Sequence, residues 1–179
     1  MKSFVVIALV MTTLSSNSQN IEEKIQTIRK HFSEIELAIS KDQYESKTEH
    51  ISNDSEGIEG TITKYYEGKK LKKIVSEEVI YGENLQKTSY YVWNDKLFFV
   101  YHQSQAPRHI DARKTEYHHT ENRYYFYDEK PIRCLGKTFV VNPDSNITAK
   151  DLSAKTASKE KNCNDAKNII EKFKSLKSN

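Results

Sequence analysis

The chain has 179 residues, 36% of them hydrophobic and 30% charged, and its formal net charge at pH 7 is +3. This length and composition are typical of one globular domain that buries a core of its own. Basic residues are interleaved with acidic ones along the chain, so the charge does not favour nucleic acid as a partner, and we expect none.

The first 18 residues have the layout of a secretory signal peptide. A lysine precedes an apolar run over about residues 4–14, and the small residues Ser16 and Ser18 lie just before Gln19. The apolar run is shorter than the roughly 20 residues that cross a bilayer. The alternative is a buried N-terminal strand. We therefore expect a signal peptide over residues 1–18, a secreted or periplasmic location, and no integral membrane span.

An amphipathic helix is predicted over about residues 21–40. Its apolar side chains recur at steps of three and four residues, which places them on one stripe. Glu22 and Glu23 lie in the first turn, where negative charge stabilises a helix. The apolar stripe must therefore cover another element of the fold. It consists of Ile21, Ile25, Ile28, Phe32, Ile35 and Ile39.

Over about residues 58–135 the pattern becomes extended, and one unit occurs three times. Each copy has a Tyr pair, a turn, and then Lys followed by Leu or Pro and an apolar residue, which indicates a β-hairpin. Asn94-Asp95 and Asp128-Glu129 suit the turns of the second and third copies. The sequence thus predicts an antiparallel meander of about six strands. The copies are KYYEGKKLKKI (64–74), which is one residue shorter than the others, SYYVWNDKLFFV (89–100) and RYYFYDEKPIRC (123–134).

The aromatic residues of these hairpins are candidates for a binding surface. Side chains alternate between the two faces of a strand, and two helices cover a sheet of about six strands only in part. Tyr recurs where Phe or Leu would pack as well, and its hydroxyl favours a surface that is apolar yet wet. The competing interpretation is a core beneath the first helix. The candidate binding residues on one face are Tyr66, Tyr91, Trp93 and Tyr125.

The C-terminal part is predicted to hold a polar loop and a second helix. Residues 142–160 are poor in large apolar side chains, whereas over about residues 161–177 apolar side chains recur at helical steps. Lys174 and Lys177 suit the last turn of such a helix. Residues 19–179 are therefore expected to form a single α+β domain with a helix at each end of the sheet.

The chain has two cysteines, Cys134 and Cys163. They are too far apart for a CxxC redox motif and too few for a structural zinc site. In an oxidising compartment such a pair predicts a disulfide, and the alternative is two separate buried thiols. Cys163 would lie on the inward stripe of the second helix, where it could meet Cys134 at the end of the third hairpin.

Two resemblances follow from these motifs. The phrases GTITKYYEGKKLKKIV, TSYYVWNDKLFFVYH and ENRYYFYDEKPIRC, after an Ile-rich helix, resemble a group of uncharacterised secreted proteins of the Bacteroidetes, over residues 21–135. The Tyr-Tyr, turn, Lys-Leu rhythm is also similar to the degenerate MORN-like repeats of secreted bacterial proteins. Of the glycines that those repeats favour, the hairpins retain Gly68. The resemblances imply export and repeated hairpins, and they imply no activity.

The sequence motifs give little support for a catalytic site or a metal site. His102, His118 and His119 fall in one segment, but neighbouring residues of a strand point to opposite faces. The chain contains no GxSxG, GxGxxG, P-loop or HExxH motif, and we expect neither a cofactor nor a metal. The function we favour is a non-catalytic secreted or periplasmic module that binds a protein, peptide or glycan. The alternatives are a purely structural domain, and a cryptic hydrolase or metal protein built on the His-rich segment 102–119.

Overall fold

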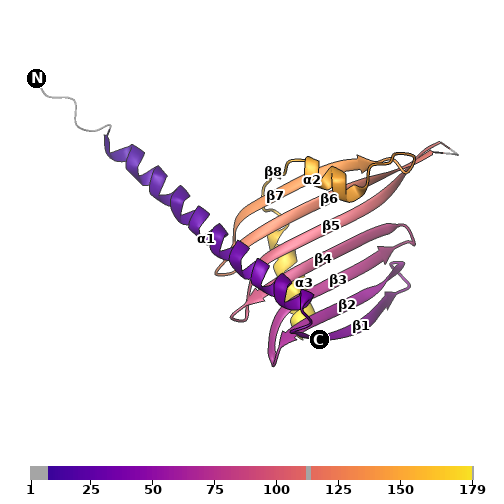
Figure 1. The fold of residues 1–179 in the computed structure, drawn as a ribbon, viewed down its shortest axis with the longest axis horizontal. Helices are drawn as coiled ribbons and strands as arrows, with labels where there is room; N and C mark the ends of the chain where they lie inside the picture. The colour runs from indigo at the N-terminus through magenta and orange to yellow at the C-terminus, as the bar shows by residue number, and fades with distance from the viewer. Residues whose placement is uncertain (1–7, 112–113, 179) are drawn as a thin grey trace, which may run out of the picture.

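The computed structural model describes residues 8–111 and 114–178 as an α+β fold with one antiparallel sheet (Figure 1). The helices are α1 (Ala8–Ser40), α2 (Ala149–Lys155) and α3 (Ala166–Ser178). The strands are β1 (Glu45–Asn53), β2 (Ile58–Glu67), β3 (Lys70–Ile80), β4 (Asn84–Trp93), β5 (Lys96–Asp111), β6 (Lys114–Tyr127), β7 (Lys130–Val141) and β8 (Lys159–Glu160). Each strand pairs with the next one along the chain, so the sheet is a meander in the order β1 to β8.

Helices cover both faces of the sheet, with α1 on one face and α3 on the other (Figure 1). Two apolar clusters follow from this arrangement, and we call them the α1 cluster and the α3 cluster. The buried members of the α1 cluster are Ile25, Ile28, Ile35, Tyr91, Phe98, Phe99 and Tyr125. The α3 cluster includes Ile62, Leu71, Ile74, Tyr90, Val92, Leu97, Val100, Tyr124, Phe126, Phe173 and Leu176 among its buried members.

The predicted stripe of α1 faces the sheet. Ile25 and Ile35 are 0% exposed, and the other stripe residues belong to or pack against the same cluster. Ion pairs fix the helix at both ends of this contact: Lys73 Nζ lies 2.6 Å from Glu36 Oε1, and Arg133 Nη1 lies 3.1 Å from Glu22 Oε2. The helix itself continues further towards the N-terminus than predicted, to Ala8. Within residues 8–111 and 114–178, no helix is both long and apolar enough to cross a bilayer.

The hairpin turns lie where the sequence predicted them. Asn94 and Asp95 have φ angles of 48° and 63°, and Asp128 and Glu129 have 48° and 58°. Positive φ at both central residues is the property of type I′ turns, whose twist matches that of the paired strands. Asn and Asp tolerate this region better than most residues, which explains how Asn94, Asp95 and Asp128 adopt it without glycine; Glu129 adopts it as well.

Each of the three hairpins also carries a β-bulge just after its turn. The register shifts between Tyr91 and Val92 in the second hairpin and at the corresponding step of the others. A bulge places two residues opposite one and redirects a side chain. As a result, Phe98 joins Phe99 on the α1 side, and Ile132 packs against the same cluster. The bulges of the second and third hairpins therefore enlarge the apolar surface under α1, whereas the extra residue of the first is Lys72.

The sheet is larger than predicted, with eight strands rather than about six. The first strand, β1, was missed because eight of its nine residues are exposed and its sequence ESKTEHISN lacks apolar alternation. The predicted polar loop 142–160 contains the short helix α2 and the two-residue strand β8. The last helix begins at Ala166, so Cys163 precedes it rather than lying in its first turn.

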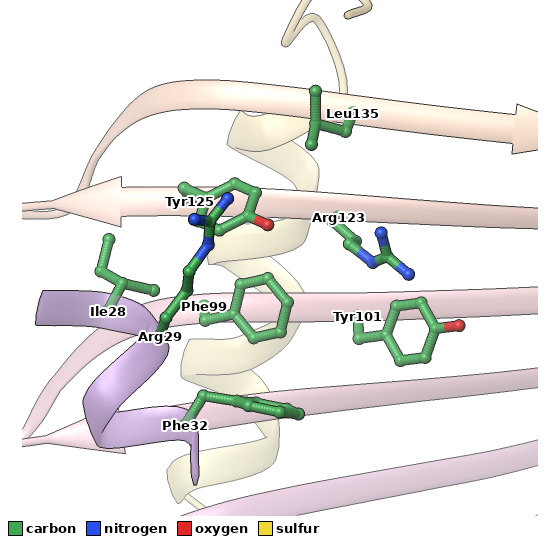
Figure 2. Close-up of a pocket in the computed structure, with 8 residues that line it drawn as sticks. All are labelled: Ile28, Arg29, Phe32, Phe99, Tyr101, Arg123, Tyr125 and Leu135. Atoms are coloured by element: carbon green, nitrogen blue, oxygen red, sulfur yellow. The ribbon is translucent and has the colours of Figure 1, made fainter. Parts of the chain in front are cut away.

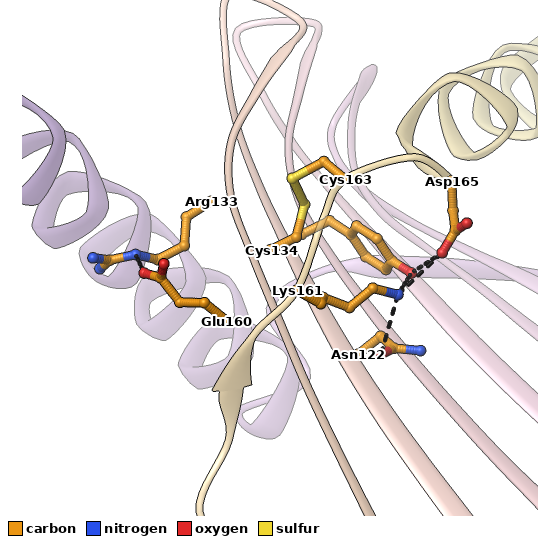
Figure 3. Close-up of a disulfide and its surroundings, with 8 residues drawn as sticks. Asn122, Arg133, Cys134, Glu160, Lys161, Cys163 and Asp165 are labelled. Carbon is orange, nitrogen blue, oxygen red and sulfur yellow. Dashed lines mark hydrogen bonds and ion pairs between the residues drawn. A yellow bond between two sulfur atoms is a disulfide. The ribbon is translucent and has the colours of Figure 1, made fainter.

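Cys134 and Cys163 form a disulfide with their Cα atoms 5.6 Å apart (Figure 3), as the sequence predicted. The backbone N–H of Lys161 also donates to the carbonyl of Cys134 at 3.0 Å, which holds the segment before α3 against β7. Lys161 Nζ lies 3.0 Å from Asp165 Oδ2 and donates to the Tyr124 hydroxyl at 3.1 Å. These contacts anchor the start of α3. A disulfide between the two cysteines of the chain favours an oxidising compartment.

Candidate binding site

The structure places three of the four predicted aromatic residues on the α1 face. Tyr91 and Tyr125 are 3% and 6% exposed in the α1 cluster, and Trp93 is half-buried at its margin. Tyr91 and Phe99 lie between Phe32 of α1 and Tyr125, with ring centroids 5.1–5.5 Å apart. The sequence left two interpretations open, a binding surface and a core beneath the first helix. The core interpretation is the one that fits Tyr91 and Tyr125.

Tyr66 differs from the other three, because it is half-buried against the α3 cluster on the opposite face. The reason is the position of each Tyr relative to its turn. Tyr91 and Tyr125 lie three residues before the first turn residue, whereas Tyr66 lies two residues before Gly68. Because side chains alternate along a strand, a shift of one residue moves the ring to the other face. Tyr65 is the true counterpart of Tyr91 and Tyr125 in this hairpin.

Trp93 lies against α1 and does not form an open platform. Its ring stacks on the His31 imidazole with centroids 3.8 Å apart and an interplanar angle of 16°. The Lys72 ammonium lies 4.6 Å from the same ring. A cavity of about 540 Å³ lies beside Trp93, between the middle of α1 and the β4–β5 and β6–β7 turns. Its lining mixes Lys24 and Lys96 with Glu23 and Asp128, so it selects no charge.

A second cavity, of about 360 Å³, lies on the α1 face of the sheet. It is bounded by α1 on one side and by β5, β6 and β7 on the other (Figure 2). Its sheet side is formed by rings from neighbouring strands: Phe99 and Tyr101 of β5 and Tyr125 of β6. Phe32 closes it from α1. We call this the arginine cavity, because two guanidinium groups also line it. The complete lining is Ile28, Arg29, Phe32, Phe99, Tyr101, Arg123, Tyr125 and Leu135.

The two arginines come from different elements and have only loose ionic partners. Arg29 of α1 has its Nη1 atom 3.7 Å from Glu22 Oε1, beyond hydrogen-bonding distance. Arg123 of β6 donates from Nη1 to the Ser158 hydroxyl at 3.2 Å, and its Nη2 atom lies 3.8 Å from Glu121 Oε2. Most of the five donors of each guanidinium thus remain available to another acceptor.

Glu121, the acidic group nearest to Arg123, is held by other residues. Its side chain is 6% exposed and lies 3.3 Å from Lys137 Nζ, directly across the β6–β7 ladder. The hydroxyls of Tyr101 and of Ser153 in α2 both donate to it at 2.5 Å. Burial raises the pKa of Glu121, but these hydrogen bonds outweigh burial and hold the pKa below its usual value. The carboxylate is therefore ionised, and it is shared between Lys137 at 3.3 Å and Arg123 at 3.8 Å, so one negative charge faces two positive ones.

The histidines of segment 102–119 do not converge. His102 lies on the α3 face, where its Nδ1 atom is 2.9 Å from the Thr88 hydroxyl and burial lowers its pKa. His119 stacks on Phe139 with centroids 5.1 Å apart. His118, as the next residue in β6, points to the opposite face from His119. Among residues 8–111 and 114–178, no group of three His, Cys, Asp or Glu side chains could hold a metal ion.

No family model, no curated protein and no solved structure matches this chain. The site is therefore interpreted from its own chemistry. Sequence reasoning identified Tyr125 but missed Arg29, Arg123 and Glu121. Strand alternation from Tyr125 would have placed Arg123 on the same face, but an arginine in a single sequence carries no sign that it lines a cavity.

Proposed function

We propose that the protein is a non-catalytic binding module whose ligand occupies the arginine cavity on the α1 face of the sheet. The observation that carries this proposal is the combination of a ring-lined hollow with two guanidiniums that have loose partners. Ligand pockets are typically about 300–1,000 Å³, mostly apolar, with a few polar groups that orient the ligand. The arginine cavity, at about 360 Å³, has this size and this composition.

The lining of the cavity supports binding rather than catalysis. It contains no Ser, Cys, His, Asp or Glu, the usual nucleophiles and general bases. The Tyr101 hydroxyl donates a hydrogen bond to Glu121. Burial is the main cause that raises the pKa of Tyr101, and this hydrogen bond is the next. Tyr101 is thus a poor proton donor to a ligand. Tyr91, which does not line the cavity, packs on Phe99 with ring centroids 5.5 Å apart and supports the floor of the cavity from the core.

A purely structural role is the second candidate, because one observation favours it. Tyr91 and Tyr125 are buried under α1, as core residues are. A structural domain would need no cavity with charged guanidiniums beside this core, so the cavity separates the two proposals. A module that binds would lose its ligand when the cavity is filled, whereas a structural domain would be unaffected.

We also propose that the protein is exported and that its mature chain begins near Gln19. The disulfide supports an oxidising compartment, and the short apolar run before Gln19 supports export. Gln19 lies within α1, two residues before the first apolar residue of the stripe. Cleavage there keeps every stripe residue that packs on the sheet. N-terminal sequencing of protein from the extracytoplasmic fraction should begin within about two residues of Gln19; a cytoplasmic protein that retains Met1 would contradict export.

The binding proposal is tested by filling the cavity. Thermal denaturation is measured with a panel of peptides, glycans and apolar small molecules, and compounds that raise the Tm are followed by NMR of the Ile and Leu methyl groups. We expect the shifts to centre on Ile28 and Leu135, and the variant Leu135→Phe to abolish them. Val140→Phe is the matched control, because Val140 lies on the same strand and is 44% exposed outside the cavity. Ligands that bind Leu135→Phe as well as the wild type would exclude this site.

A further inference from the structure

The chemistry of the arginine cavity also indicates which ligands it accepts, an inference that rests on the function proposed above. Six of its eight lining residues are aliphatic or aromatic, so a ligand must present an apolar body. Phe99 and Tyr125 lie on two adjacent strands with ring centroids 5.1 Å apart and planes inclined at 50°, and together they form an angled aromatic floor (Figure 2). A flat or branched hydrocarbon body packs well on such a surface.

The charged part of the lining is positive only. Arg29 reaches the cavity from α1 and Arg123 reaches it from β6, so the two guanidiniums border it from the helix and from the sheet (Figure 2). The carboxylate closest to Arg123, that of Glu121, is directed to Lys137, Tyr101 and Ser153. The one near Arg29, that of Glu22, forms its shorter contact, at 3.1 Å, with Arg133, which Glu160 also contacts at 3.1 Å. On the Arg123 side one carboxylate faces two cations, so the local field there favours an anion.

Arginine is also the side chain best suited to a carboxylate in a partly buried site. Its guanidinium offers two parallel N–H donors that match the two oxygens of a carboxylate. The Arg123 guanidinium lies 5.5 Å from the Tyr101 ring centroid, and this contact holds it at the edge of the aromatic floor. The side chains of Arg29 and Arg123 are 53% and 35% exposed, so a ligand can reach them without displacing a buried group.

We infer that the arginine cavity binds a small hydrophobic carboxylate, whose apolar body lies on Phe99 and Tyr125 and whose carboxylate bridges Arg29 and Arg123. The volume of about 360 Å³ limits the body to a small one, such as a fused pair of aromatic rings or a short branched chain. Peptides and glycans without such a group bind weakly by comparison.

The test uses a matched pair of probes, naphthalene-1-acetate and naphthalene-1-acetamide, which share their apolar body and differ in charge. Binding is measured by methyl NMR titration of the purified protein. We expect the carboxylate to bind at least tenfold more tightly than the amide, and Arg29→Gln and Arg123→Gln each to lower its affinity about tenfold. Neither substitution should change the affinity of the amide by more than about twofold. Higher salt should weaken the carboxylate alone.

Arg108→Gln is the matched control, because it removes the same charge from an exposed position of β5 that does not line the cavity. It should leave both affinities unchanged. Arg29→Lys and Arg123→Lys, which keep the charge but not the planar fork, should retain part of the selectivity. The Tm of each variant verifies that the fold is intact.

The outcomes separate this inference from the function on which it rests. If both probes bind equally and the arginine variants bind like the wild type, the cavity is a ligand site but the carboxylate inference is wrong. If Arg108→Gln weakens the carboxylate as much as the cavity variants do, the preference is one of net charge and the inference also fails. If neither probe perturbs Ile28 or Leu135 while another compound of the panel does, the carboxylate inference is wrong and the proposed site stands; if no compound does, both are overturned.

Discussion

The Glu121 carboxylate and the Lys137 ammonium lie 3.3 Å apart across β6 and β7, and their side chains are 6% and 5% exposed. Both groups also contact Ser153 of α2: Ser153 donates to Glu121, and Lys137 donates to the Ser153 carbonyl and hydroxyl. The ion pair and its hydrogen bonds to Ser153 therefore join β6, β7 and α2 in one buried polar cluster beside the arginine cavity. This cluster explains why α2, a helix with no buried residues of its own, is held on the sheet.

The first prediction concerns this pair. Glu121→Gln leaves the Lys137 charge buried without its counter-ion, so we expect the free energy of unfolding to fall by about 3 kcal/mol. Urea denaturation followed by circular dichroism measures the loss. Asp128→Asn is the control, because it breaks the ion pair of Asp128 with Lys96, whose side chains are 62% and 61% exposed. Exposed ion pairs contribute little, so this variant should unfold like the wild type. Equal effects of the two substitutions would contradict the importance of burial.

The second prediction concerns the disulfide. The bond between Cys134 and Cys163 closes a loop with a sequence separation of 29 residues. In the chain-entropy model such a loop stabilises the fold by about 3–4 kcal/mol. The double variant Cys134→Ala/Cys163→Ala should therefore lose about that much in denaturant unfolding. Titration of thiols in the unreduced, denatured wild type should find none, and two after reduction; two reactive thiols before reduction would show that the bond does not form.

The third prediction concerns pH. Burial, assisted by the positive charge of Lys161, lowers the pKa of His102 from 6.5, so the folded protein binds fewer protons at this site than the unfolded chain. Its contribution to stability is complete above about pH 6.5 and is lost as the pH falls through the lowered pKa. Burial lowers the pKa of His119 in the same way. Urea unfolding between about pH 8 and pH 5 should therefore show falling stability towards acid.

His102→Gln should reduce that fall, because glutamine does not titrate, and His119 accounts for part of what remains. His109→Gln is the control, since the His109 side chain is 65% exposed and lies outside the core. Measurements stop near pH 5 so that protonation of Glu121, whose pKa lies below 4.5, does not contribute. A profile of His102→Gln that is parallel to the wild type would show that this histidine is not responsible.

The fourth prediction concerns the docking of α1. Ile35 is 0% exposed and Leu37, two residues further along the same helix, is 54% exposed. Ile35→Ala should lower the free energy of unfolding by about 3 kcal/mol, because it removes buried methyl groups and leaves a cavity. Leu37→Ala should change it by less than about 0.5 kcal/mol. Trp93, stacked on His31 of α1, reports the transition by fluorescence. A similar loss in both variants would argue against this packing of the helix.

Local patterns in the sequence predicted the elements that depend on nearby residues. The stripe from Ile21 to Ile39 identified the part of α1 that packs on the sheet, because helical periodicity is a property of neighbouring residues. The repeated Tyr pairs with Asn94-Asp95 and Asp128-Glu129 located two turns, because turn geometry depends on a few adjacent φ angles. Two cysteines in a chain whose first residues resemble a signal peptide were enough to predict the disulfide.

Features that depend on distant contacts were not predictable in this way. The edge strand β1 is polar and exposed, so it is a strand because β2 pairs with it and not because of its own pattern. The face of Tyr66 depended on register, which a shift of one residue reverses. The arginine cavity arises because α1 covers the sheet only partway, and Arg29 and Arg123, 94 positions apart in the sequence, both line it. The sequence by itself determined which helix and hairpins form and which cysteines pair, whereas the packing of α1 across β5, β6 and β7 decided where the arginine cavity lies, because that cavity depends on contacts between distant residues.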